Sequence, residues 1–205
     1  LKMDPIKSTC AVQGFGNVGS ISAKLIAMQG LKIVAISDVT GGYYKKDGIN
    51  IEEAIAYVEK NNGTLEGFNA DKLSNSDLLT LDVDVLVPAA MEDQITDDNA
   101  HAIKAKLIVE GANGPIASNA DTILHKNKVN VVPDILANAG GVTVSYFEWV
   151  QNRLGYYWTE ERVNRRADRV MKQAFDNVFQ AAQKYDVSMR TAAYIVAIDK
   201  VASTE

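Results

Sequence analysis

Three glycines constrain the fold of this chain more than any other feature. Gly14, Gly16 and Gly19 follow the apolar run at residues 6–12 and have the spacing G-x-G-x-x-G. In a strand-to-helix turn, the first such glycine permits a sharp bend, the second lets the backbone approach a pyrophosphate, and the third lets the helix pack closely. The helix then directs its unpaired N–H groups and the positive end of its dipole at the phosphates. Glycine-rich turns also occur without a ligand, so the motif needs support from its surroundings.

The next forty residues provide that support. Apolar residues recur at helical spacing after the glycines, at Val18, Ile21, Leu25 and Met28. A second apolar run at residues 31–37 then ends at Asp38. Dinucleotide-binding folds place an acidic residue about 20 positions beyond the glycines, where it binds the adenosine ribose 2′-OH. This carboxylate would repel the 2′-phosphate of NADP and favours NAD, although Thr40, Lys45 and Lys46 lie near enough in sequence to leave NADP possible.

The alternation of apolar runs with helical patterns predicts the fold class. We expect an α/β fold with a Rossmann-like, doubly wound, mostly parallel sheet, helices on both faces and a C-terminal helical segment. Strands are expected at residues 6–12, 31–37, 83–87, 107–110 and 129–132, with a small hairpin around residues 46–48 and a short helix at residues 96–104. A long helix is expected to begin after Thr159.

The same pattern predicts the domain organisation. We expect residues 1–150 to form a Rossmann dinucleotide-binding domain. Residues 151–205 are expected to be helices that pack on it and lead back toward a further, substrate-binding domain. Because the sequence begins at Leu1 and reaches a strand within a few residues, we expect it to be a piece of a longer protein.

Composition narrows the function classes. The 205 residues are 47% hydrophobic and carry a formal net charge of −5, which predicts a packed globular protein. There is no dense basic run of the kind that binds nucleic acid, and no apolar stretch long enough to cross a bilayer. The single cysteine, Cys10, is expected to be a small buried residue, and the reducing cytoplasm is the expected location.

The sequence offers no separate catalytic or metal-binding pattern. His101 and His125 lie in helical segments far from the glycine motif, and no residues have metal-ligand spacing. The basic residues between positions 162 and 169 are interpreted as a solvated helix face. We therefore predict no metal site and name no catalytic residue.

Several ordered blocks together resemble one enzyme family. The blocks are residues 13–19, 88–90, 109–115 and 134–142, and they resemble the cofactor domain of the glutamate/leucine/phenylalanine/valine dehydrogenases. Residues 144–152 resemble the glutamate dehydrogenase branch in particular, and the likeness extends over nearly the whole chain. It implies hydride transfer between the α-carbon of an amino acid and C4 of the nicotinamide of NAD, or NADP. With L-glutamate as the substrate, hydrolysis of the iminium product would yield 2-oxoglutarate and ammonia.

The resemblance also implies a set of site residues. The cofactor-binding residues would be Gly14, Phe15, Gly16, Asn17, Val18 and Gly19 around the pyrophosphate, with Asp38, Val39, Ala89, Ala90, Asn113 and Asn138 around the rest of the dinucleotide. Ala89, Ala90 and Asn113 would line the nicotinamide ribose site, and Asn138 would contact the nicotinamide end. Val142 and Ser145 would be substrate-binding, with the Ser145 hydroxyl on the side-chain carboxylate of glutamate.

The resemblance further implies what this chain does not contain. In the family, the catalytic lysine and aspartate and a substrate-binding lysine belong to a separate N-terminal domain, and nothing here resembles that domain. We therefore expect L-glutamate or 2-oxoglutarate to bind between this chain and the missing domain, and the chain alone to be inactive. The full-length protein is expected to be a homo-hexamer.

Alternative interpretations remain open at this stage. The chain could be a non-catalytic nucleotide-sensing Rossmann domain, or part of a dehydrogenase for an apolar amino acid. Residues 138–152 argue against the first, since they would serve substrate rather than nucleotide, and Ser145 argues against the second. Asn113 and Asn138 could equally be turn residues, and the Ser145 hydroxyl could bond its own helix backbone.

Overall fold

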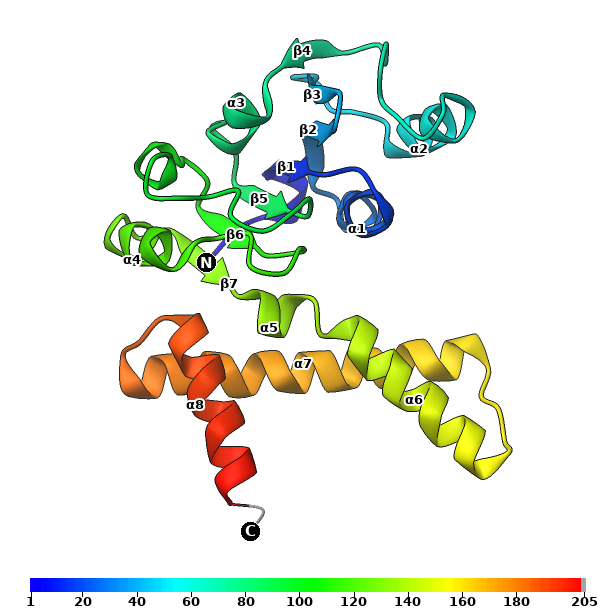
Figure 1. Cartoon of the computed structure of the whole chain (residues 1–205), viewed down its shortest axis with the longest axis vertical. Coiled ribbons are helices and arrows are strands. Elements are labelled where there is room, and N and C mark those ends of the chain that lie inside the picture. Colours follow the sequence, from blue (N-terminus) through cyan, green and yellow to red (C-terminus); the bar gives the residue numbers. More distant parts are fainter. Residues whose placement is uncertain (204–205) are drawn as a thin grey trace. The chain divides into compact units, whose positions relative to one another are not determined.

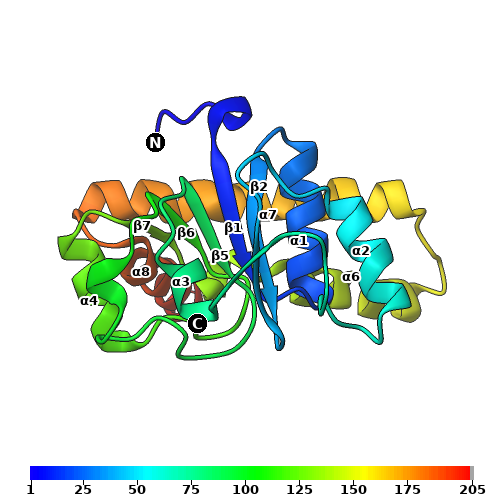
Figure 2. The same ribbon diagram turned by 90° about the horizontal axis from the view of Figure 1, so that it is seen from above.

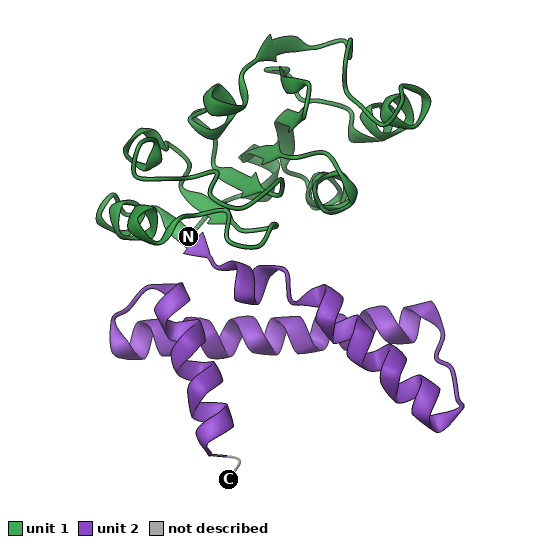
Figure 3. Cartoon of the chain, in the orientation of Figure 1, with its two compact units in different colours: residues 1–130 green, residues 131–205 purple. Residues whose placement is uncertain are grey.

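The computed structural model describes residues 1–203 and divides the chain into two compact units, Leu1–Asn130 and Val131–Glu205 (Figure 3). Residues 204 and 205, the end of the expected C-terminal segment, lie outside the described residues. The sequence predicted a functional boundary after residue 150. That boundary stays a prediction, because the compactness of a unit does not define where cofactor binding ends.

A seven-stranded sheet forms the centre of the first unit (Figure 1). Its strands are β1 (Thr9–Gln13), β2 (Lys32–Asp38), β3 (Gly41–Tyr44), β4 (Asp71–Leu73), β5 (Val85–Pro88), β6 (Leu107–Val109) and β7 (Asn130–Val132), in the spatial order β4-β3-β2-β1-β5-β6-β7. The pairs β1–β2, β1–β5 and β5–β6 are parallel, whereas β3 pairs antiparallel with β2 and with β4. The predicted mostly parallel α/β sheet is confirmed.

Helices cover both faces of this sheet, as predicted. α1 (Asn17–Met28) and α2 (Ile51–Lys60) lie on one face, and α3 (Asn75–Leu79) and α4 (Ser118–Lys126) lie on the other (Figure 2). The side chain of Asn50 caps α2, and Ser74 forms a capping box with Asp77 at the start of α3. These caps pair N–H groups that the first turn of a helix leaves without partners, so the local sequence determines where the helices begin.

The core lies between the sheet and its helices. Cys10 and Val12 alternate with residues of the opposite face along β1, and both pack against α1 and β2 side chains such as Ile33 and Ile36. The predicted burial of Cys10 is confirmed, and the loss of solvent raises the pKa of its thiol to about 12. This thiol is therefore a core group and not a nucleophile.

The helix predicted after the glycines is confirmed, but its apolar residues are not its buried face. The four residues whose spacing predicted α1 are exposed: Val18, Ile21, Leu25 and Met28. Gly19 and Ala23 are buried instead. A Cβ atom at Gly19 would overlap the carbonyl oxygen of Gly14, so the close approach of α1 to the turn requires a residue without a side chain.

Three local predictions were wrong. The expected strand at residues 6–12 begins only at Thr9, because Pro5–Lys7 forms a 3-10 turn and Ile6 is 79% exposed. The hairpin joins β2 to β3 and turns at Thr40, whose backbone N–H donates to the Asp38 side chain. Lys46 and its neighbours form a turn that leads instead into α2, with Gly48 N donating to Lys45 O at 3.0 Å.

The third wrong prediction is the helix at residues 96–104, where only Ala100–Ala102 form a 3-10 turn. The side chain of Asn99 accepts from Thr96 N and donates to Gln94 O. These bonds hold Asn99 against the segment before the turn, and the turn ends at Ile103, whose backbone is extended (φ −63°, ψ 127°) and whose side chain is buried.

The second unit is helical. It contains α5 (Asp134–Ala137), α6 (Gly140–Leu154), α7 (Glu160–Tyr185) and α8 (Met189–Ala202), so the long helix predicted after Thr159 is confirmed. Its small core consists of Leu136, Val178, Ala192 and Ala193. Arg190 of α8 forms a 3.3 Å ion pair with Asp134 of α5.

The basic residues of α7 are not simply a solvated face. The guanidinium groups of Arg162 and Arg166 lie 5.1 and 4.4 Å from the centre of the Trp158 ring. Such cation–π contacts stabilise the packing of Trp158, which precedes α7, against this helix. Arg165 and Arg169 are exposed, so the prediction holds for these two residues only.

Candidate functional site

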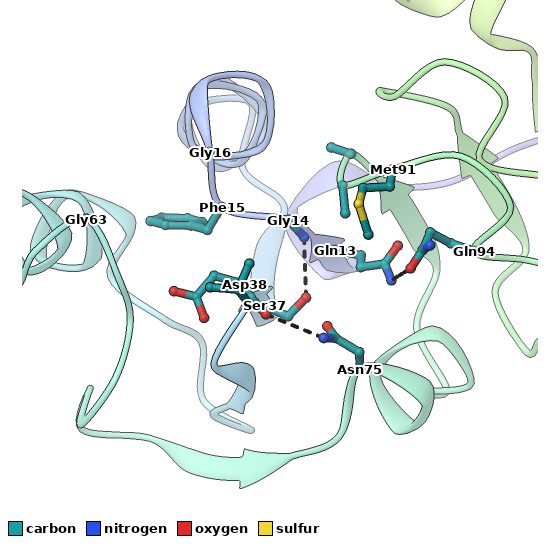
Figure 4. Close-up of a pocket in the computed structure, with 13 residues that line it drawn as sticks. Gln13, Gly14, Phe15, Gly16, Ser37, Asp38, Gly63, Asn75, Met91 and Gln94 are labelled. Atoms are coloured by element: carbon teal, nitrogen blue, oxygen red, sulfur yellow. Dashed lines mark hydrogen bonds between the residues drawn. The ribbon is translucent and has the colours of Figure 1, made fainter.

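A cavity in the first unit lies where the order of the strands reverses. β1 has β2 on one side and β5 on the other, and the loops after the three strands meet at their carboxyl ends (Figure 1). Ligands of doubly wound folds bind at such a switch point. A cavity of about 340 Å³ lies here (Figure 4), lined by Gln13, Gly14, Phe15, Gly16, Ser37, Asp38, Val39, Gly63, Asn75, Ala89, Ala90, Met91 and Gln94.

The structure brings seven of the predicted cofactor residues together around this cavity: Gly14, Phe15, Gly16, Asp38, Val39, Ala89 and Ala90. Asn17, Val18 and Gly19 form the first turn of α1, directly after the cavity-lining Gly16. Asn113 is exposed in the connection between β6 and α4 and does not line the cavity.

The remaining predicted residues belong to the second unit. Asn138 ends α5, and Val142 and Ser145 lie exposed on α6. Within the described residues, the Ser145 hydroxyl makes no hydrogen bond to its helix, whereas the Thr143 hydroxyl donates to Ala139 O at 2.8 Å. The alternative that Ser145 merely bonds its own backbone therefore has no support, but its role in binding stays a prediction.

Gly14 holds the turn and does not offer its own amide to a ligand. Its φ of +88° is a left-handed conformation that favours glycine, and a Cβ here would lie 2.8 Å from the carbonyl oxygen of Ala89. Its backbone N–H donates to the Ser37 hydroxyl at 3.3 Å. Ser37 thus fastens the turn after β1 to the end of β2.

Gly16 has a different environment. It is the N-cap of α1, it makes no side-chain cap hydrogen bond, and a Cβ built on it meets no atom within 4 Å. The N–H groups of the first turn of α1 therefore begin beside open space. A helix N-terminus of this kind attracts anions through its unpaired N–H groups and its dipole.

Asp38 is already engaged within the protein. Its Oδ1 accepts hydrogen bonds from the backbone N–H of Thr40 at 2.8 Å and from the Thr40 hydroxyl at 2.6 Å. Its Oδ2 accepts from Leu65 N at 2.6 Å. A carboxylate oxygen has two acceptor positions, so Oδ2 can accept one more donor, such as a ribose hydroxyl. The Thr40 hydroxyl also pairs with Tyr43 Oη at 2.9 Å, which ties this threonine into the fold.

Hydrogen bonds between neighbouring loops fix the other side of the cavity. The backbone N–H groups of Gly111 and Ala112 both donate to Pro88 O at 3.0 Å. A Cβ at Gly111 would lie 3.0 Å from the Cβ of Ala89, so the loop after β6 presses against the end of β5. Ala89 and Ala90 are held at the rim in this way. Glu110, the residue directly after β6, is fully buried.

Sequence reasoning missed six of the lining residues: Gln13, Ser37, Gly63, Asn75, Met91 and Gln94. Gln13 and Ser37 did leave a signal, since each is a polar residue at the end of an otherwise apolar strand. Gly63, Asn75 and Gln94 left none, because loops distant in sequence bring them there. Asn75, for instance, donates to the main-chain oxygen of Asp38 at 3.4 Å.

Two features are absent from the described part of the chain. Residues 1–203 contain no group of three or more His, Cys, Asp or Glu side chains that could hold a metal ion. In this same part of the chain, every helix is too short or too polar to pass through a membrane.

Known proteins provide the comparison. The family model described as Glutamate/Leucine/Phenylalanine/Valine dehydrogenase matches residues 1–205. A glutamate dehydrogenase of Thermotoga maritima is 53% identical over 204 residues, which are 98% of this chain and 49% of that protein. The NADP-specific glutamate dehydrogenase A1 of Halobacterium salinarum is 48% identical over 98% of this chain and 49% of its own length.

A solved structure gives the same result. The hetero-hexameric glutamate dehydrogenase of Thermus thermophilus, in a Leu-bound form, superimposes with a TM-score of 0.92 at 28% identity, over 100% of this chain and 48% of that one. The chain therefore spans about half the length of the relatives that it matches. These relatives include glutamate dehydrogenases named as NADP-specific and as NAD-specific.

Proposed function

This chain belongs to the glutamate/leucine/phenylalanine/valine dehydrogenase family, and from that premise we propose that it is the cofactor-binding part of an NAD(P)-dependent glutamate dehydrogenase. The observation that carries the proposal is the cavity at the carboxyl ends of β1, β2 and β5, where Gly16 leaves open space beside the N-terminus of α1. An anionic dinucleotide is the ligand class that such a site fits.

The residues of the cavity suit this cofactor. The N–H groups around Gly16, Asn17 and Val18 would bind the pyrophosphate, and the free acceptor position on Asp38 Oδ2 would take a hydroxyl of the adenosine ribose. Ala89 and Ala90 would leave room for the nicotinamide ribose. When bound, the dinucleotide supplies hydride acceptance or donation, while this chain binds and orients it.

We propose NAD as the preferred form. The carboxylate of Asp38 would repel a 2′-phosphate, and Thr40, the nearest hydroxyl, is engaged by Asp38 and Tyr43. Likeness to relatives does not decide this point, since they include enzymes of both specificities.

Substrate selection is proposed for the second unit. Ser145, with an exposed hydroxyl, would donate to the side-chain carboxylate of glutamate, and Val142 would line the pocket beside it, while Asn138 would contact the nicotinamide end of the cofactor. An apolar amino acid would leave that hydroxyl unpaired, which favours glutamate over leucine or valine.

The complete enzyme would need a second domain. The family's catalytic lysine and aspartate have no counterpart in this chain, so oxidative deamination of L-glutamate to 2-oxoglutarate and ammonia would require a substrate domain to complete the cleft. We propose that the full-length protein is a homo-hexamer; the hetero-hexameric Thermus thermophilus relative supports an assembly of six subunits, and their identity is part of the proposal.

The test is a pair of measurements on the purified 205-residue chain. Calorimetric titration with NAD should show binding, and an assay with NAD and L-glutamate should show no NADH formation. Absence of NAD binding would overturn the cofactor role. Glutamate oxidation by the chain alone would overturn the assignment of catalysis to another domain.

A further inference from the structure

One residue that lines the cavity carries a buried polar atom with no hydrogen-bond partner among the described residues. Gln13 ends β1 and is only 2% exposed. Among the described residues, its Oε1 is a fully buried side-chain oxygen that accepts no hydrogen bond. A buried carbonyl without a donor destabilises the folded state, so its presence at a ligand cavity calls for an explanation.

Hydrogen bonds fix the orientation of this amide. Gln13 Nε2 donates to Gln94 Oε1 at 2.8 Å, and Gln94 Nε2 donates to Glu92 O at 3.0 Å. If Gln13 were turned over, its Oε1 would face Gln94 Oε1, and turning Gln94 as well would set two acceptors together at Glu92 O. The relay from Glu92 through Gln94 therefore keeps Oε1 of Gln13 unpaired and in place.

Gln94 is itself held rigidly. Its backbone N–H donates to Pro115 O at 2.9 Å, and its carbonyl accepts from Asn99 Nδ2 at 2.9 Å. Gln13 is therefore held by strand β1, and Gln94 is held by hydrogen bonds of its own backbone N–H and carbonyl groups. A preorganised acceptor of this kind binds a ligand donor without losing side-chain freedom.

The position of Gln13 indicates which part of a dinucleotide it would meet. In the cavity, Gln13, Met91 and Gln94 lie to one side of Gly14, and Asp38 lies to the other (Figure 4). If Asp38 binds the adenosine ribose, the pyrophosphate crosses near Gly14 and the opposite half of the ligand reaches Gln13. That half offers two kinds of donor, the ribose hydroxyls and the carboxamide N–H.

We propose that Oε1 of Gln13 accepts a hydrogen bond from the nicotinamide nucleoside of the bound dinucleotide, with Gln94 as the residue that positions it. This inference rests on the proposed cofactor role. Binding would pair an acceptor that is buried and unpaired in the free chain. The same acceptor would make no contact with ligands that lack this nucleoside.

The test compares NAD with ADP in calorimetric titrations of the wild-type chain and the Gln13→Leu variant. Loss of one hydrogen bond should weaken NAD binding about 3- to 10-fold and leave ADP binding unchanged within error. The melting temperature without ligand should change little, because leucine removes a buried unpaired oxygen together with the hydrogen bond from Gln13 Nε2 to Gln94 Oε1. Gln13→Met, with a longer unbranched side chain, is the second variant if leucine fits poorly.

Other results of these titrations would contradict either this inference or the proposed cofactor role. If the ratio of NAD to ADP affinity were unchanged in both variants, this inference would be overturned. An equal fall in both affinities would give that result and would indicate a structural role for Gln13. If the wild-type chain bound neither ligand, the proposed cofactor role itself would have failed. Titration with 3-acetylpyridine adenine dinucleotide, which lacks the carboxamide N–H, then separates the two donors. If the variant binds this analogue more weakly than wild type does, the donor is a ribose hydroxyl. If the two proteins bind it equally well, the donor is the carboxamide.

Discussion

The backbone N–H of Leu65 donates a 2.6 Å hydrogen bond to Oδ2 of Asp38, a residue 27 positions earlier in the chain. Leu65 is fully buried, so this bond fastens the loop after α2 to the end of β2. The acidic residue that sequence spacing marks as a ribose ligand is therefore also a structural anchor. A substitution at Asp38 should therefore affect both roles, and two different measurements can follow them.

Asp38→Asn should change both stability and cofactor preference. An amide has only one oxygen, so a backbone N–H of Thr40 or Leu65 would face an NH₂ group, which should cost about 1–2 kcal/mol in the free energy of unfolding. Loss of the negative charge should raise the affinity for NADP relative to NAD. Urea unfolding and paired titrations measure these effects, with the exposed Asp71→Asn as control. An unchanged affinity ratio would remove Asp38 from the ribose site.

Gly16 and Gly19 should respond differently to a side chain. A valine at Gly16 meets no protein atom at its Cβ, so the chain should fold, while the side chain blocks hydrogen bonds to the pyrophosphate. Since each charge-assisted bond contributes about 1.5–3 kcal/mol, NAD affinity should fall about 10- to 100-fold or more. Unaltered affinity in calorimetry would contradict the phosphate site.

The matched comparison is Gly19→Ala against Gly16→Ala. A Cβ at Gly19 overlaps the carbonyl oxygen of Gly14, so the free energy of unfolding should fall by about 2–3 kcal/mol. Gly16→Ala should change stability far less. Equal stabilities of the two variants in denaturant melts would show that α1 does not need to approach the turn so closely.

Ser145→Ala should affect substrate use and spare the cofactor. The variant is made in an enzyme that joins this chain to its substrate domain. Loss of a hydrogen bond to a carboxylate should lower kcat/KM for glutamate about 10- to 100-fold. The KM for NAD should hardly change. Thr143→Ala is the control, since its hydroxyl already donates to Ala139 O. Equal effects on glutamate and NAD would refute the substrate role.

Asp84 should make stability depend on pH. Its hydrogen bond to the Lys106 ammonium, at 2.7 Å, lowers the pKa of the carboxyl, and the Thr9 backbone N–H lowers it further. Since the folded-state pKa is below the unfolded value of about 3.9, this stabilisation is present above that pH and is lost as pH falls through the folded value.

Asp84→Asn should therefore lower stability by about 1 kcal/mol at pH 7, with the difference from wild type shrinking below about pH 4. Urea melts at pH 7, 5 and 3 give the comparison, with the exposed Asp98→Asn as control. A difference that stayed constant over this range would show that ionisation of Asp84 contributes nothing.

Local chemistry made much of the fold predictable. The turn at Gly14, the helix that follows it and most of the strands depend on near neighbours in sequence, and the structure has them where they were expected. The exposed apolar stripe of α1 was not foreseen, because helical spacing identifies a helix without showing which side packs. The helix expected after Thr96 is only a short 3-10 turn, because the backbone becomes extended at the buried Ile103, which spacing alone does not show.

Some residues of the candidate site could likewise be predicted from the sequence, and others could not. Seven lining residues follow from the glycine motif, the acidic residue at the end of β2 and the family resemblance. Gln94 and Asn75 could not be predicted, since only the folded sheet brings their loops to the end of β1. The unpaired state of Gln13 Oε1 also depends on a partner 81 positions away.

A crystal structure of the chain with NAD tests the central claim most directly. The account predicts the pyrophosphate within hydrogen-bonding distance of the backbone N–H groups at the start of α1, with the adenosine ribose at Asp38. Density for the dinucleotide at any other place, with the space beside Gly16 filled only by solvent, would contradict it.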